Sequence, residues 1–69
     1  MDNPIGHFRR LRGMTQRQLS DASGVSFGAL LKLENGQRKI MSAQLATILQ
    51  LTQALGITAE ELAEAAEKY

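Results

Sequence analysis

Gly24, Val25 and Ser26 separate two helical segments by one tight turn, and this short connection restricts the fold more than any other feature of the sequence. The segment before the turn opens with a capping box, because Thr15 and Gln18 have the T-x-x-Q spacing that lets each side chain bond the other's backbone amide. Gly24 suits the left-handed residue that closes a helix, and Ser26 is a favourable N-cap for the next helix. Two short helices joined by so short a turn must cross steeply rather than run antiparallel.

Start and stop signals of the same kind divide the rest of the chain into three further short helices. The boundaries that they predict are Asn3-Pro4 to Gly13 for the first helix, Ser42 to Gly56 for the fourth, and the capping box Thr58–Glu61 at the start of the fifth. No stretch alternates between apolar and polar residues as a half-buried strand does. The sequence therefore predicts an all-α fold of five short helices with loops of two to six residues, in which the second and third helices form a helix-turn-helix. At 69 residues, the chain is expected to form a single domain, residues 1–69.

Apolar residues at helical spacing predict which faces turn toward the core. The expected core residues are Ile5, Phe8 and Leu11 in the first helix, Leu19 and Ala22 in the second, Ala29, Leu30 and Leu33 in the third, Ile40 in the following loop, and Leu45, Ile48, Leu51, Thr52 and Leu55 in the fourth. In the fifth helix, an apolar stripe runs to the last residue and consists of Leu62, Ala65, Ala66 and Tyr69. Because chain ends usually fray, this stripe suggests a dimer contact, although packing within the chain explains it equally well.

The composition argues against several classes of function. The chain has no cysteine, which excludes disulfides and thiolate chemistry, and its one histidine, His7, cannot by itself build a transition-metal site. No nucleophile–base pair or metal cluster is visible, so we expect no enzyme activity, no metal, no cofactor and no small-molecule ligand. No apolar run approaches 18 residues and no signal-peptide pattern opens the chain, so we expect a soluble, cytoplasmic protein that does not bind a membrane.

Basic and acidic residues are divided unevenly along the chain. Residues 1–39 carry seven Lys or Arg against three Asp or Glu, whereas residues 40–69 carry one against four. A basic half and an acidic half suggest that a polyanion binds on one side only. In so small a number of charges, however, such a division also arises by chance.

The third helix contains more apolar residues than one inward stripe needs. At about 100° per residue, its expected core residues lie on one side, and the opposite side carries Phe27, Gly28, Leu31, Lys32 and Asn35. A steep helix-turn-helix presents one short helix to a groove, and the major groove of B-form DNA, about 12 Å wide, admits one α-helix. The third helix is therefore the candidate reader of double-stranded DNA.

The segment TQRQLSDASGVSFGALLKLENGQRK resembles the helix-turn-helix of the phage repressor and Cro family, also called XRE-type, and the resemblance extends from about Ile5 to Leu62. The shared features are Thr15-Gln16, Ala22, Gly24-Val25-Ser26, Glu34-Asn35-Gly36 and, at the entry to the fifth helix, Ala54 to Thr58. This resemblance implies a lambda-repressor-like fold and a sequence-specific regulator of transcription, with a repressor acting as a homodimer on a two-fold operator. It also implies a bacterial or phage-encoded protein that associates with the nucleoid through DNA.

The resemblance implies a role for each matching residue. DNA bases would be read by Phe27, Gly28, Leu31 and Lys32, and phosphates would be contacted by Gln16, Asn35, Gln37, Arg38 and Lys39. Arg17 and Ser26 are further candidates for phosphate contacts. Arg9 and Glu34 match a pair that the family buries as a structural ion pair between the first and third helices. Arg10, Arg12 and Arg17 either reach a phosphate or are merely solvated.

The base-reading positions depart from the family, in which they are usually polar. Only Lys32 can donate to a guanine edge, while Phe27 and Leu31 can contact only apolar groups, such as thymine methyls. Three interpretations stay open: Phe27 and Leu31 read thymine methyls, they form an exposed patch for a protein partner, or Phe27 folds back onto the core. The second corresponds to an alternative function, that of an antitoxin or adaptor-type protein-interaction module.

Overall fold

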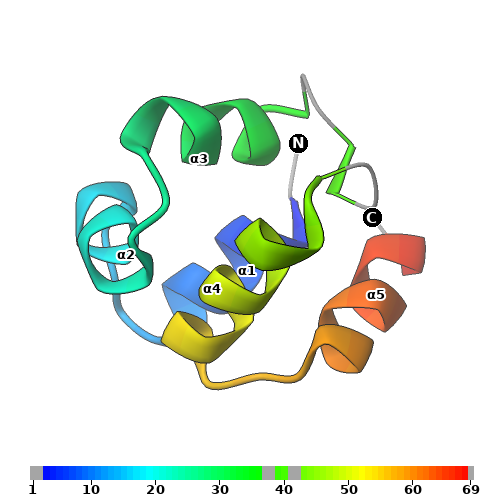
Figure 1. The fold of residues 1–69 in the computed structure, drawn as a ribbon. Helices are drawn as coiled ribbons and strands as arrows, with labels where there is room; N and C mark the ends of the chain where they lie inside the picture. The colour runs from blue at the N-terminus through cyan, green and yellow to red at the C-terminus, as the bar shows by residue number, and fades with distance from the viewer. Residues whose placement is uncertain (1–2, 37–38, 41–42, 69) are drawn as a thin grey trace.

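The computed structural model describes residues 3–36, 39–40 and 43–68, and these residues form five helices (Figure 1). The helices are α1 (Pro4–Leu11), α2 (Gln16–Ser23), α3 (Phe27–Glu34), α4 (Leu45–Leu55) and α5 (Ala59–Lys68). No described residue lies in a strand, which confirms the predicted all-α fold. The helix α2 packs against α3 and α4, α1 packs against α3 and α5, and α4 packs against α5. None of the helices in the described ranges is long and apolar enough to cross a membrane.

Side-chain caps begin the helices largely where the sequence predicts them. The side chain of Asn3 accepts a hydrogen bond from the amide of Ile5 at 2.9 Å, directly before Pro4 opens α1. Both predicted capping boxes are formed, with the reciprocal bonds of Thr15 and Gln18 at 3.0 and 2.8 Å before α2. Those of Thr58 and Glu61 are 3.0 and 3.1 Å at the start of α5. These caps satisfy amide groups that no helical carbonyl reaches.

The start of α4 differs from the prediction. This helix begins at Leu45, and Gln44 occupies its N-cap position without a side-chain cap bond. The predicted cap, Ser42, lies outside the described residues. Residues 35–44 therefore connect α3 to α4, which is longer than the predicted two to six residues. Ile40 is buried in this connection, as the sequence predicts.

The core draws on every helix. Its buried apolar residues in the described ranges are Ile5, Leu19, Val25, Leu30, Leu33, Ile40, Leu51, Leu55 and Leu62. Phe8, Ala29 and Ile48 are half-buried and pack against this cluster. Because a domain this small buries little surface, each of these side chains matters for stability.

Three predicted core residues instead face solvent, and the geometry of short helices explains each. Leu11 is 62% exposed, because steps of three residues from Ile5 turn it about 120° away from the buried stripe. Leu45 is 69% exposed, since it is the first residue of α4 and lies about 120° around the helix from Leu51. Ala22 is exposed because α2 turns its serines inward, where they bond the tight turn.

Candidate nucleic-acid interface

Two inward serines of α2 hold the tight turn between α2 and α3. The hydroxyl of Ser20 donates to the carbonyl of Val25 at 2.7 Å, and the hydroxyl of Ser23 accepts from the Val25 amide at 3.2 Å. Gly24 closes α2 in the left-handed conformation with φ of 77°. Residues that carry a side chain rarely adopt this backbone conformation, whereas glycine does so without steric cost. The angle between the two helices is thus fixed by local hydrogen bonds and by the burial of Val25.

The two faces of α3 separate as the helical geometry predicts. Leu30 and Leu33 are buried, and Ala29 is half-buried against the core. Gly28, Lys32 and Asn35 are exposed on the other side, and the space where a Gly28 side chain would lie is open for 4 Å. The exposed side of α3 therefore has room for another molecule close to its backbone.

Phe27 and Leu31 lie between these two faces. Both side chains are half-buried, and neither is among the described residues that pack against the core cluster. The guanidinium of Arg17 covers the Phe27 ring, with its central carbon 4.1 Å from the ring centroid. This stacking disfavours the interpretation that Phe27 folds back onto the core, because the ring packs against a cation of α2. It also places Arg17 beside the first turn of α3.

An ion pair fastens the end of α3 to α1. The Arg9 Nε donates to both carboxylate oxygens of Glu34, at 3.1 and 3.3 Å, while Arg9 Nη1 donates to the Met14 carbonyl at 2.9 Å. The side chains of Arg9 and Glu34 are only 14% and 6% exposed. Gln16 Nε2 also donates to Glu34, at 3.3 Å. One carboxylate thus joins α1, α2 and α3.

Two further contacts hold the same junction, and sequence reasoning did not identify them. Asn3 Nδ2 donates to the carbonyl of Leu33 at 2.8 Å, so the residue that caps α1 also binds the last turn of α3. A methyl group added at Gly6 would lie 3.1 Å from a Glu34 oxygen, which shows how closely α1 approaches the carboxylate. A glycine at this helical position was the only sequence signal of that approach.

The remaining candidate phosphate contacts occupy different environments. Ser26 is exposed, and its hydroxyl accepts from the Ala29 amide at 3.3 Å as the N-cap of α3. Arg17, Asn35 and Lys39 are exposed, whereas Gln37 and Arg38 lie outside the described residues. Arg12 Nε donates to the Leu55 carbonyl at 2.8 Å, so Arg12 binds the end of α4.

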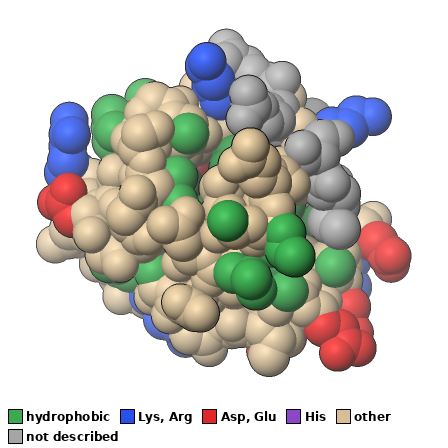
Figure 2. All heavy atoms as spheres, in the orientation of Figure 1, with side chains coloured by type: hydrophobic (Ala, Val, Ile, Leu, Met, Phe, Trp, Pro, Cys, Tyr) green, Lys and Arg blue, Asp and Glu red, His purple; other side chains and the backbone are tan. Residues whose placement is uncertain are grey.

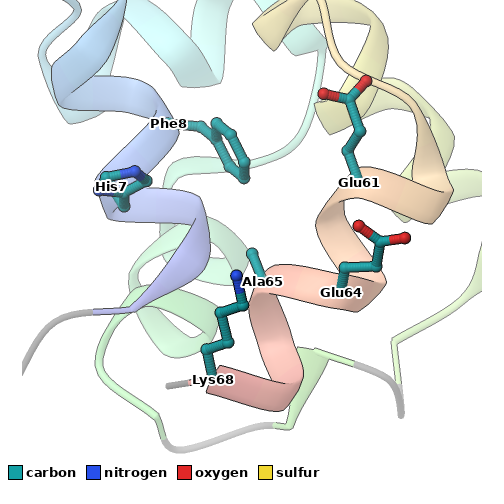
Figure 3. A pocket seen from close by; sticks show the side chains of 6 residues that line it. All are labelled: His7, Phe8, Glu61, Glu64, Ala65 and Lys68. Atoms are coloured by element: carbon teal, nitrogen blue, oxygen red, sulfur yellow. The ribbon is translucent and has the colours of Figure 1, made fainter.

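The apolar stripe of α5 serves mainly the core of the chain itself. Leu62 is 1% exposed, Ala65 and Ala66 are half-buried, and Tyr69 lies outside the described residues. A shallow depression of about 280 Å³ lies between α1 and α5 (Figure 3). Its lining residues are His7, Phe8, Glu61, Glu64, Ala65 and Lys68. Among the described residues, no group of histidine and acidic side chains could hold a metal ion. Two glutamates in this depression would repel a polyanion.

Comparison with known proteins adds one match. A family model described as helix-turn-helix matches residues 5–62 of the chain. No curated protein matches the chain. The matched span begins within α1 and ends within α5, so it includes the tight turn, all of α3 and the Arg9–Glu34 ion pair.

Proposed function

Because the chain belongs to the XRE-type helix-turn-helix family, it is a DNA-binding regulator of transcription, and we propose that it represses transcription as a homodimer on a two-fold operator. The observation that carries the proposal is the orientation of α3. Its inward side is fixed by Leu30, by Leu33 and by the bonds of Glu34, while its outward side is open around Gly28 and Lys32. A rigid helix with an open side suits insertion into a major groove.

The proposed base contacts lie on the open side of α3. Lys32 donates to a guanine edge or to a neighbouring phosphate, and Leu31 packs against a thymine methyl. Phe27 offers an apolar edge to the groove while Arg17 covers one ring face. Gly28 allows the α3 backbone to approach the bases. Readout then depends mainly on methyl groups and on shape, with one charged donor.

The proposed phosphate contacts surround this helix. Arg17 approaches the backbone of the DNA from α2, and Ser26 does so from the start of α3. The loop residues Asn35, Gln37, Arg38 and Lys39 do so from the other end of the helix. A glutamine amide carries two N–H donors, so Gln16 has a second donor for a phosphate while the first binds Glu34. These contacts position the protein, because phosphates carry no sequence information.

The proposed dimer follows from the small size of one reading helix. Eight residues form α3, and the few bases that one such helix contacts specify too short a sequence. Two copies on a two-fold site double the contacts and set the spacing of the half-sites to about one helical turn of DNA. The repressor then acts by occupying the operator and excluding polymerase. The proposed repressor acts in the cytoplasm of a bacterial or phage-infected cell.

Selection of bound duplexes from a random pool tests the proposal. We expect enriched sequences with two inverted half-sites and an affinity that falls steeply with salt concentration. Enrichment of no common sequence, together with weak binding that is insensitive to salt, would contradict DNA recognition. A stable complex with another protein in the absence of DNA would instead support the antitoxin or adaptor-type module.

A further inference from the structure

The outward face of α4 exposes two large apolar side chains on successive turns. Leu45 is 69% exposed and Leu49 is 42% exposed, although both lie in a helix whose other side packs into the core. Ala46, Gln50 and Gln53 are exposed beside them, so these five residues form one stripe along the helix. We call this stripe the α4 face. Adjacent exposed apolar side chains, unlike single scattered ones, are a feature of interaction surfaces.

The α4 face has no charge. The uncharged sequence IMSAQLATILQLTQALGITA, residues 40–59, includes all of α4, although charged residues make up 22% of the whole chain. Figure 2 shows hydrophobic side chains gathered over α4, with charged side chains toward the edges of the view. An uncharged surface helix attracts neither a polyanion nor a strongly charged partner.

We propose that the α4 face binds the α4 face of a second copy of this chain. In a two-fold interface the same surface meets itself, so every charged residue faces a like charge or must find an opposite one nearby. The α4 face avoids this repulsion because it carries no charge. Its leucines, in contrast, gain from burial twice, once in each copy. The inference deepens the proposed function, since it names the surface that forms the proposed homodimer.

The alternative surface, α5, is poorly suited to pair with itself. Its apolar residue Leu62 is already buried within the chain, so α5 has less apolar area to offer a partner. Its exposed side carries four acidic residues, Glu60, Glu61, Glu64 and Glu67. Two copies of this side would place like charges together, which is unfavourable. The stripe of α5 is thus already used within the chain and the exposed side of α5 is acidic, so α4 is the more suitable surface.

Sedimentation equilibrium without DNA tests the inference. The parent should form a dimer over a concentration series, and Leu45→Glu and Leu49→Glu should each raise its dissociation constant by about 100-fold or more, because each change occurs twice in the interface. The matched control is Leu11→Glu, which alters a leucine of similar exposure on α1 and should leave the dissociation constant within about twofold. Circular dichroism should show that all three variants stay helical.

A spin label tests the same interface independently, in a protein that keeps both Leu45 and Leu49. The chain has no cysteine, so Gln53→Cys provides a unique attachment site at the edge of the α4 face. Labelled protein mixed with isotope-enriched parent should broaden the amide signals of α4 in the enriched copy. Broadening confined to α5 would overturn the inference.

Two further results would also overturn the inference. One is a parent protein that stays monomeric throughout the concentration series, and the other is that the glutamate variants dimerise as strongly as the parent. DNA binding by the parent is measured separately. A monomer that binds a selected duplex would contradict only the α4 interface. A dimer through α4 that binds no DNA would contradict only the proposed function.

Discussion

The guanidinium carbon of Arg17 lies 4.1 Å from the centroid of the Phe27 ring, so a cation of α2 covers an aromatic side chain at the first position of α3. This contact crosses the tight turn between the two helices. It gives Phe27 a partner other than the core and holds Arg17 beside the proposed DNA surface. Arg17 therefore contributes both to the packing of α2 against α3 and to the positive charge beside the proposed DNA surface.

The Arg17–Phe27 contact should contribute measurably to folding. We expect a coupling free energy of about 0.5–1 kcal/mol between Arg17→Ala and Phe27→Leu, the usual size for a cation over an exposed ring. Urea unfolding of the parent, both single variants and the double variant gives this value. A cycle of Lys32→Ala with Phe27→Leu is the control and should show no coupling. Additive effects in the first cycle would show that the stack is not stable in solution.

The Arg9–Glu34 pair predicts a much larger effect. Arg9→Ala leaves the carboxylate of Glu34 buried with Gln16 as a remaining donor, and breaking such a pair costs about 3–5 kcal/mol. Because the core of a domain this small rarely supplies more than about 3–5 kcal/mol of stability, thermal melting should show a largely unfolded variant. Arg9→Met combined with Glu34→Leu should recover part of the loss, since neither charge stays buried. A variant Arg9→Ala that melts like the parent but no longer binds DNA would assign Arg9 to the interface instead.

Local chemistry explains which parts of the fold the sequence predicts well. The caps at Asn3, Thr15, Ser26 and Thr58 depend on residues two or three positions apart, so the sequence alone contains the whole interaction. Leu11 and Leu45 are predicted inward but are exposed, because six residues at about 100° each turn them about 120° away from the buried Ile5 and Leu51. An apolar spacing that is nearly helical therefore does not by itself establish which residues are buried.

The contacts around the candidate site could be predicted only in part. The family resemblance implied the pair Arg9 and Glu34, which lie 25 positions apart and do form an ion pair. The bonds of Gln16 to Glu34 and of Asn3 to Leu33 were missed, because they join residues that are adjacent only after three helices have packed. The DNA contacts themselves stay predictions.

Gly28 offers a test in which stability and binding change in opposite directions. Gly28→Ala should stabilise the fold by about 0.5–1 kcal/mol, because alanine favours a helix over glycine and the site has open space for a methyl group. If the α3 backbone approaches the bases, the same methyl should weaken binding to the selected duplex. Gly24→Ala is the contrasting control and should destabilise the fold by about 1–2 kcal/mol, since φ there is 77°. Unchanged binding by Gly28→Ala would show that the backbone stays away from the DNA.

Salt dependence counts the phosphates that the protein neutralises. If Arg17, Arg38 and Lys39 each contact one phosphate in both protomers, log K against log salt should have a slope of about −5, from roughly −0.9 per phosphate. Lys39→Ala should reduce this slope by about 2, because both protomers lose a contact, and should weaken binding to all sequences similarly. Fluorescence anisotropy at several salt concentrations measures both quantities. A parent slope shallower than about −2 contradicts this electrostatic arrangement.

Leu31 should recognise thymine methyl groups. Replacing the thymines of the selected half-site with uracil removes only the methyl groups and keeps every base-pair donor and acceptor. We expect a loss of roughly 1 kcal/mol per contacted methyl, on the scale of one buried methylene. Leu31→Ala should weaken binding to the thymine duplex and leave affinity for the uracil duplex nearly unchanged. This double cycle separates the contact from general damage to the protein. Equal loss on both duplexes, or no loss on either, would mean that Leu31 does not read thymine, and the partner-patch interpretation would take its place.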